Sequence, residues 1–181
     1  MSRTPNIVNI IDLEATCWEG AESPEDSRQE IIEIGLAVVS VREKEIQKTE
    51  SILVEPVQSE VSKFCEELTS LTQERLEEEG ISFYKAKKEL YENYDSDARP
   101  FASWGNFDRR AFKRDCKVKN VGYPFCTHMN VKTLDAWEAE LKNGKGLRTA
   151  MRRRNLEFEG EHHRGEDDAY NVAKVLLDIF S

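Results

Sequence analysis

The stretch NIVNIIDLEATCW, residues 6–18, determines how the rest of the chain is interpreted. Apolar side chains alternate along its first half, which predicts a β-strand. Asp12 and Glu14 are two residues apart, so their carboxylates project from one face of that strand, about 7 Å apart along the backbone. Val8 and Ile10 precede them on the same face, which therefore changes from apolar to doubly acidic at its carboxyl end. Two acids beside an apolar stretch are costly unless a cation neutralises them.

A third acid, Asp108, lies in FASWGNFDRRAF, residues 101–112. We expect it in the first turn of a helix that follows a short strand. The helix dipole favours a carboxylate there, which by itself is a sufficient structural explanation for an isolated Asp. For Asp12 and Glu14, the structural explanation is that both acids lie at an exposed end of a strand.

The segment HHRGEDDAYNVAKVL, residues 162–176, contains the H-x4-D spacing twice, as His162–Asp167 and as His163–Asp168. On a helix, Asp168 lies one turn before Val172 on the apolar stripe, whereas Asp167 lies on a more polar face. We therefore expect Asp168 to point toward the sheet, with His163 as its partner. Asp167 and His162 are interpreted as their solvent-side neighbours.

Together these residues predict a divalent-metal site for cutting phosphodiester bonds. Clustered carboxylates repel one another unless cations neutralise them, and carboxylate oxygens are ligands that Mg²⁺ or Mn²⁺ prefers. Two such ions about 4 Å apart stabilise the attacking and leaving oxygens of an in-line phosphoryl displacement. A neutral histidine can take the proton of the attacking water. Zinc is disfavoured, because the chain has 3 histidines and its cysteines form no ligand spacing.

Composition is that of one globular domain spanning residues 1–181, with 39% hydrophobic and 34% charged residues. No apolar run is long enough to cross a bilayer, and no signal-peptide pattern is present, so we expect a cytoplasmic protein. The 4 cysteines form no metal-binding spacing and are expected to be reduced and mostly buried.

The net charge is −9, which argues weakly against a protein that coats nucleic acid. The charge is uneven, however. Residues 109–119 are strongly basic, and a second basic stretch comprises Lys142, Lys145, Arg148 and Arg152 to Arg154. A solvated helix face explains either stretch alone. Because two such stretches flank the predicted site, contact with phosphates is as well supported as a solvated helix face.

The expected fold is α/β, with a mixed sheet flanked by helices. The first three strands are expected to form an antiparallel meander, the first two joined by the polar residues 19–29. The later strands are expected to be parallel and to alternate with helices. We expect strands at Ile7–Glu14, Ile31–Val41, Ile46–Val54 and Arg99–Trp104, with a short one before Leu134, and helices at Val61–Glu78, Phe83–Tyr94, Asn106–Val118, Val131–Leu141, Leu147–Arg154 and Glu166–Phe180.

The motifs DLEAT, SWGNFD and H-x4-D, with Asp12, Glu14, Asp108, His163 and Asp168, resemble the three signature segments of the DEDDh exonucleases. This group includes ribonuclease T, oligoribonuclease-like enzymes and polymerase proofreading subunits. The segments DLEATCWEG, EIIEIG, FCEELTSLTQ and HRGEDDAYNVA are similar to the branch that contains the histone-mRNA and small-RNA 3′-exonucleases and the bacterial sporulation-inhibitor-type exonucleases. The similarity covers residues 7–180 in the expected order.

The resemblance implies a ribonuclease H-like fold and two-metal 3′→5′ hydrolysis that releases nucleoside 5′-monophosphates. It implies that Asp12, Glu14 and Asp168 bind the catalytic ion, that Asp12 also holds the second ion, and that Asp108 supports the second ion through water. His163 is then the general base. Residues that receive the terminal nucleotide in relatives correspond to Ala15, Thr16, Leu71 and Phe107, although core packing explains Leu71 and Phe107 equally well.

Single-stranded RNA 3′ ends are the expected substrate, with Mg²⁺ as cofactor and Mn²⁺ as a substitute. DNA remains an alternative, because recognition of the 2′-hydroxyl depends on contacts that the sequence does not display. A non-catalytic binding module is a third, less favoured hypothesis, because the catalytic set is complete. We expect no additional nucleic-acid-binding domain before or after the catalytic one, which favours short RNA 3′ ends or recruitment by a partner. The sequence leaves the oligomeric state open.

Overall fold

A mixed five-stranded sheet forms the centre of the molecule. The computed structural model describes residues 6–21 and 28–181, and the strands within them are β1 (Ile7–Ala15), β2 (Ile31–Ser40), β3 (Glu45–Leu53), β4 (Phe101–Ser103) and β5 (His128–Asn130). Their order in the sheet is β3-β2-β1-β4-β5. The first three strands are antiparallel neighbours, whereas β4 runs parallel to β1 and β5 parallel to β4. The predicted meander followed by parallel strands is confirmed.

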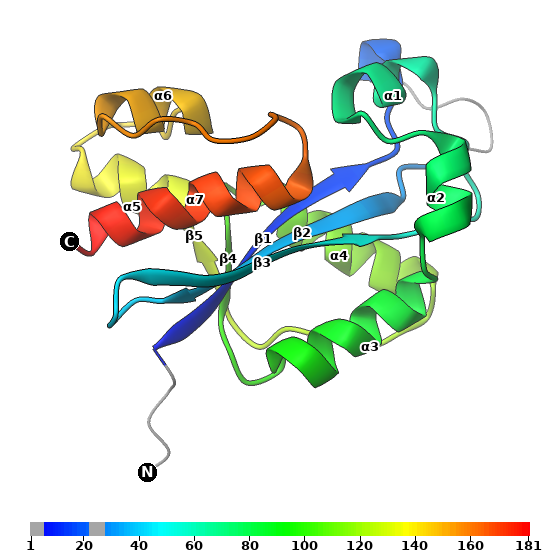
Figure 1. Cartoon of the computed structure of the whole chain (residues 1–181), viewed down its shortest axis with the longest axis horizontal. Helices are drawn as coiled ribbons and strands as arrows, with labels where there is room; N and C mark the ends of the chain where they lie inside the picture. The colour runs from blue at the N-terminus through cyan, green and yellow to red at the C-terminus, as the bar shows by residue number, and fades with distance from the viewer. Residues whose placement is uncertain (1–5, 22–27) are drawn as a thin grey trace.

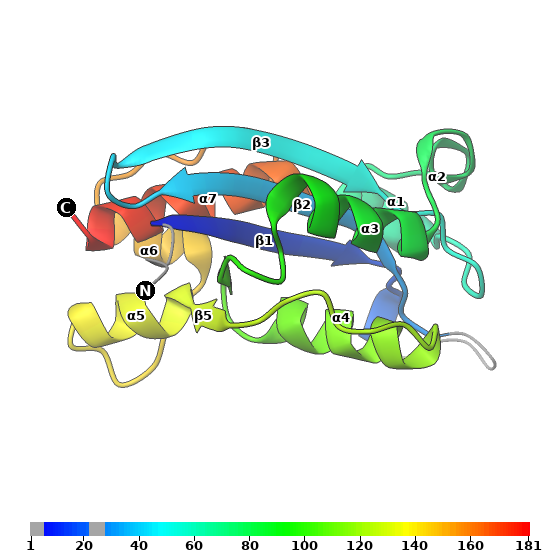
Figure 2. The same cartoon turned by 90° about the horizontal axis from the view of Figure 1, so that it is seen from below.

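Helices cover both faces of this sheet. They are α1 (Lys63–Thr69), α2 (Gln73–Glu79), α3 (Phe83–Tyr94), α4 (Phe107–Val118), α5 (Val131–Glu138), α6 (Leu147–Arg153) and α7 (Gly165–Ile179), with a 3-10 turn at Glu19–Ala21. Figure 1 shows α5, α6 and α7 on one side of the sheet and α3 and α4 on the other. The view in Figure 2 shows the same layers from below, with α4 beneath β1. Within the described residues, no helix is both long and apolar enough to cross a membrane.

Strand β1 divides its side chains between the two layers. Ile11 and Leu13 belong to the core under α3 and α4, whereas Val8 and Ile10 belong to the core under α7. The alternation continues past Ile10, so the next side chains on the α7 face are acidic. The predicted face is therefore confirmed, and the acids of β1 lie beneath the beginning of α7.

Strand β2 lets α7 approach the sheet unusually closely. All its residues are buried because helices cover both faces. A Cβ atom added to Gly35 would lie 1.7 Å from the carbonyl carbon of Gly165, the first residue of α7. Gly35 is paired with Asp12 across the two strands. The contact between these glycines therefore fixes the first turn of α7 beside the acidic end of β1.

The expected helix at residues 61–78 is wrong as a single element, because two short helices occupy it. The Ser62 and Thr72 side chains each accept a backbone N–H of the helix that follows, and Ser70 ends α1 in the left-handed region with φ 60°. Local capping therefore separates what apolar spacing alone joins. Asn106 precedes α4, but its side chain makes no capping hydrogen bond.

The cysteines differ in their exposure. Cys65 and Cys116 are buried as expected, whereas Cys126 is exposed. Of the predicted connection at residues 19–29, residues 22–27 lie outside the described part.

Candidate active site

Three carboxylates meet where β1 ends beneath α7. One oxygen from each of Asp12, Glu14 and Asp168 lies within 4.8 Å of the others. Asp12 and Glu14 come from the α7-facing side of β1, and Asp168 comes from the first turn of α7. Glu14 and Asp168 are only 8% and 3% exposed, so the cluster is shielded from bulk water. The predicted orientation of Asp168 toward the sheet is confirmed.

Asp108 lies beside this cluster at the start of α4. It is 3% exposed, and its Oδ1 accepts the backbone N–H of Leu13 at 3.1 Å. This bond ties α4 to β1 between the two acids of the strand. One oxygen of Asp108 is thus committed to the backbone, and the residue is not part of the group of three carboxylates.

Both histidines of the segment before α7 contact Asp168. The backbone N–H of His163 donates to Asp168 Oδ2 at 2.7 Å, and Nδ1 of His162 lies 2.9 Å from Asp168 Oδ1. The two imidazole rings stack with centroids 4.0 Å apart. Both rings line the same cavity as the acids.

The interpretation of His162 as a solvent-side neighbour is therefore wrong. His163 adopts a left-handed backbone with φ 67°, which turns the chain just before α7. Helical spacing does not extend to residues outside the helix, so it could not place His162. Asp167, in contrast, remains partly exposed, and its Oδ2 accepts the backbone N–H of Glu161 at 2.8 Å.

Burial, together with neighbouring negative charge, raises the pKa of the two acids on β1. Burial raises the pKa of Asp12 well above its ordinary value, and the Asp108 and Asp168 carboxylates raise it further. Burial, followed by the Asp168 and Glu33 carboxylates, raises the pKa of Glu14 to about 9. With a pKa of about 9, Glu14 keeps its proton at neutral pH when no cation is bound, and a bound cation would replace that proton.

The pKa values of Asp108 and His163 are shifted in opposite directions. Burial raises the pKa of Asp108 to about 6, although hydrogen bonds from backbone N–H groups and from Ser103 oppose that rise. Burial lowers the pKa of His163 below 6.5, helped by His162 and Arg148. A lowered pKa keeps the His163 ring neutral near pH 7, as a proton acceptor requires.

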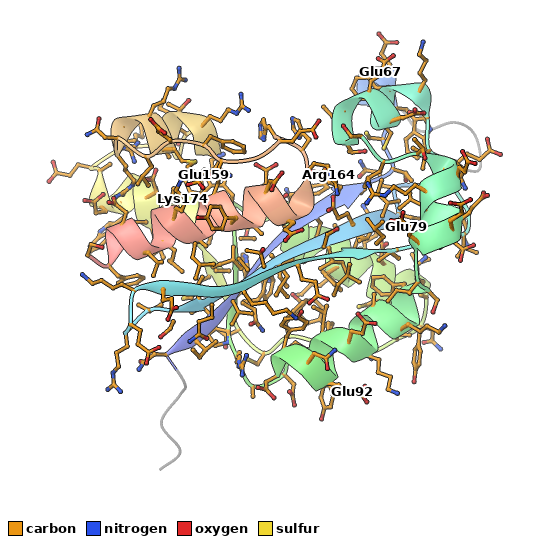
Figure 3. All side chains as sticks on the ribbon, viewed as in Figure 1. Glu67, Glu79, Glu92, Glu159, Arg164 and Lys174 are labelled. Carbon is orange, nitrogen blue, oxygen red and sulfur yellow. The ribbon has the colours of Figure 1, made fainter. Side chains whose placement is uncertain are left out.

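The pair of Glu33 and Arg164 is a part of the site that was not predicted from the sequence. Glu33 is fully buried on β2, and its carboxylate accepts the N–H of Gly165 at 3.0 Å and contacts the Arg164 guanidinium at 3.3 Å. Figure 3 shows Arg164 at the start of α7. An acid within the apolar run EIIEIG was the signal that could have identified it.

A cavity of about 340 Å³ opens over the acids. Phe107, 42% exposed, lies on its wall, and so do Trp104, Gly146 and Leu147, which were not predicted from the sequence. Trp104 immediately follows β4 and could have been inferred from SWGNFD. Leu147 comes from α6, and nothing in its local sequence indicates that it reaches this cavity.

The structure does not bring the other predicted nucleotide-binding residues to the cavity surface. Leu71 is fully buried in a core cluster with Ile32 and Leu76, so the expectation that its side chain contacts the nucleotide is wrong. The Thr16 hydroxyl accepts the backbone N–H of Glu30. The backbone N–H of Thr16 in turn donates to the backbone carbonyl of Glu30. Ala15 is 6% exposed at the end of β1, next to Glu14.

The donor set fits a hard divalent cation. Three carboxylates converge, each can supply an oxygen ligand, and burial together with the neighbouring carboxylates raises the pKa of Asp12 and Glu14. Within residues 6–21 and 28–181, no Lys or Arg forms an ion pair with Asp12, Glu14 or Asp168. The residues present therefore suit a cation of the Mg²⁺ or Mn²⁺ class better than a site neutralised by the chain itself.

Comparison with known proteins connects this geometry to one family. Residues 9–176 match the RNase_T family model, described as Exonuclease. The chain is 30% identical to the probable 3′-5′ exonuclease KapD of Bacillus subtilis, covering 96% of this chain and 84% of that protein. It is 27% identical to 3′-5′ exoribonuclease 1 of Rattus norvegicus, covering 93% of this chain but 51% of that longer protein.

Among solved structures, the nuclease domain of 3′hExo, a DEDDh family member bound to rAMP, superposes with a TM-score of 0.86. The two are 23% identical, and the match covers 98% of this chain and 92% of that domain. The fold is accordingly ribonuclease H-like, as expected. The chain spans about half the length of the mammalian exoribonuclease that it resembles.

Proposed function

Because this chain belongs to the exonuclease family and is a 3′→5′ exonuclease of the DEDDh type, we propose that it shortens single-stranded RNA from the 3′ end with two Mg²⁺ ions. The convergence of Asp12, Glu14 and Asp168 within 4.8 Å carries this proposal. Residues 1–181 would form a single exonuclease domain, and nucleoside 5′-monophosphates would be the products.

Asp12, Glu14 and Asp168 would hold the first cation, and Asp12 would be shared with the second. Bound cations would stabilise the charge that develops on the attacking and leaving oxygens. Asp108 would act through water, because one of its oxygens is already committed to the N–H of Leu13. Its exclusion from the group of three carboxylates supports that indirect role.

His163 would accept the proton of the attacking water. Its lowered pKa supports this role, and the bond from its backbone N–H to Asp168 holds it beside the acids. His162, stacked on His163 and bonded to Asp168, would position that ring rather than exchange the proton itself.

Phe107 and Trp104 would receive the terminal nucleotide. An aromatic face stacks on any base, so this wall suits removal of nucleotides without sequence preference. Ala15 would approach the nucleotide through its backbone, whereas Thr16 would support that backbone through its bonds to Glu30.

The name of one relative and the ligand bound to another favour RNA over DNA. The rat relative is named an exoribonuclease, and the solved nuclease domain holds rAMP. Both observations concern the relatives, and their extension to this chain is part of the proposal.

The test is digestion of a 5′-labelled single-stranded RNA with Mg²⁺ or Mn²⁺, beside a DNA oligonucleotide of the same sequence. We expect a ladder of shortened RNA, nucleoside 5′-monophosphate products and slower loss of the DNA. Asp12→Asn should abolish the ladder, whereas Asp97→Asn, the same chemical change at an exposed acid, should leave it intact.

Faster digestion of the DNA would contradict the choice of RNA. Intact RNA and DNA with either metal, accompanied by measurable RNA binding, would instead favour a binding module that retains the nuclease fold.

A further inference from the structure

The arginines at α6 and its end fall into two pairs with different environments. Arg153 and Arg154 both contact the buried carboxylate of Asp135, at 2.5 and 2.8 Å. Within the part of the chain that the structure describes, Arg148 and Arg152 form no ion pair, and Arg152 makes only a 3.5 Å bond to Thr149. Arg148 and Arg152 are four residues apart, so they share one face of α6.

That face borders a second cavity of about 460 Å³. Its described lining contains two cations and no acid, and the remainder is apolar apart from backbone: Arg148, Met151, Arg152, Leu156, Phe158 and Gly160. An exposed cavity of this composition combines positive charge with surface on which a planar ring can stack. These are the two features that proteins use to bind single-stranded nucleic acid.

Aromatic side chains connect this second cavity with the catalytic one. The Arg148 guanidinium lies 4.7 Å from the centroid of the Phe158 ring, and that ring lies 5.5 Å from the His162 ring. His162 in turn stacks on His163 at 4.0 Å. Leu147, adjacent to Arg148 in the chain, lines the catalytic cavity. The two cavities are therefore neighbours along a single path over the segment before α7.

Two acids near this path are engaged by other groups. Glu159 pairs with Lys174 at 2.6 Å, and Figure 3 shows the two residues together on the α7 side of the molecule. Asp167 accepts the N–H of Glu161. Because Arg148 and Arg152 themselves form no ion pair within the described residues, their positive charge is available to a ligand.

We propose that the cavity formed by Arg148, Arg152 and Phe158 binds the nucleotides immediately upstream of the one being removed. This inference rests on the proposed function, because the occupant is the same single-stranded polynucleotide. The arginines contact the first phosphates on the 5′ side of the scissile phosphate, and Phe158 stacks on a base. The consequence is a preference for substrates longer than two nucleotides.

Substrate length separates this cavity from the catalytic one. A dinucleotide without terminal phosphates has only the scissile phosphate, so it offers Arg148 and Arg152 no upstream phosphate to contact. A 12-nucleotide RNA offers several. The ratio of kcat/KM for the 12-mer to kcat/KM for the dinucleotide therefore measures what the contacts between the second cavity and the upstream phosphates contribute.

The experiment measures that ratio in the full chain for the wild type, Arg152→Gln and the Arg148→Gln/Arg152→Gln double variant. We expect Arg152→Gln to lower the ratio by about fivefold and the double variant to lower it further, because each arginine makes charge-assisted hydrogen bonds to phosphate. The slope of log kcat/KM for the 12-mer against log salt should become shallower by about 0.7 for each phosphate that is no longer neutralised. Lys85→Gln, which removes one exposed charge from α3 on the other face of the sheet, is the control and should leave both unchanged.

An unchanged ratio in the double variant would overturn the inference while leaving the proposed function intact. An equal fall in Lys85→Gln would also overturn it, because the effect would then follow net charge rather than this cavity. Failure of the wild type to hydrolyse either substrate would contradict the proposed function itself, together with the subsite that depends on it.

Discussion

Two groups of buried carboxylates in this molecule differ in what neutralises them. Asp135 lies against Arg153 and Arg154, and Glu30 lies against Lys119 at 2.7 Å and accepts backbone N–H groups. The acids at the end of β1 have no such cation among the described residues, and the pKa of Glu14 is raised to about 9, whereas that of Glu30 is lowered. A buried acid that the chain neutralises holds the fold together. A buried acid that the chain leaves without a cation is available for a ligand.

Removing a charge from the catalytic group should have the largest effect on activity. Asp168→Asn should lower kcat by about 10³-fold, because several kcal/mol of transition-state stabilisation depend on the cations that the acids would hold. The same variant should unfold at equal or higher urea concentration than the metal-free wild type, since it relieves repulsion. Measured kcat and urea unfolding curves check both parts, and a variant with nearly full activity would break the distinction between the two groups.

The opposite result is expected for the neutralised group. Asp135→Asn should lower the free energy of unfolding by about 3 kcal/mol, because Arg153 and Arg154 lose a fully buried partner. Activity per folded molecule should stay near that of the wild type at temperatures well below the melting point. Thermal or urea unfolding measures the loss. A variant as stable as the wild type would show that these ion pairs do not stabilise the fold.

The pH dependence of stability should distinguish the metal-free from the metal-bound protein. The folded-state pKa of Glu14 is about 9 against an ordinary value of 4.5, so the folded state binds more protons than the unfolded state between these values. The stabilising contribution is complete below pH 4.5 and is lost as pH rises toward 9. We expect the metal-free protein to lose about 2 kcal/mol between pH 5 and pH 8, which is half the limit set by about 1.4 kcal/mol per pH unit for one fully retained proton.

Urea unfolding at several pH values, after treatment with a chelator, measures this loss. Saturating Mg²⁺ or Mn²⁺ should reduce it, because the cation replaces the protons. Metal-free stability that rises over the same pH range would show that the acids are compensated within the chain.

The smallest predicted effect concerns His162. Activity should fall with decreasing pH as the His163 ring becomes protonated, at a pKa below 6.5. His162→Asn removes one of the groups that lower this pKa, so the acid side of the pH–rate profile should move to higher pH by about half a unit. Measurement of kcat from pH 5 to pH 8 checks the direction. A shift to lower pH would contradict this role of His162, whereas loss of most activity together with the acid limb would indicate that His162, not His163, takes the proton.

The elements that local pattern determines were predictable from the sequence. Apolar alternation predicted β1, a run rich in β-branched residues predicted β2, and helical spacing predicted Phe83–Tyr94 as observed for α3. The division of the helix at residues 61–78 was not predictable from periodicity, because it depends on the left-handed conformation of Ser70. The same turn precedes Leu71, which packs inward, so a motif match could not reveal that this side chain is buried.

At the site, the acids could be identified because each lies on a regular element with a definite face. The two histidines could not be distinguished correctly, because they precede α7 in a segment whose positive φ no spacing rule predicts. Leu147 reaches the site through tertiary packing alone, and only the assembled fold shows that it lies in the same cavity as Asp12.

The contact between Gly35 and Gly165 has a consequence for how the enzyme can be damaged or altered. The contact sets the distance between Asp12 on β1 and Asp168 on α7. No side chain that could repack lies between the two glycine backbones. A single methyl group at Gly35 would push α7 away from the sheet. The carboxylates would then lie farther apart, although each would remain chemically unchanged. Inactivating substitutions in this protein are thus to be sought at a position that carries no functional group, as well as among the acids themselves.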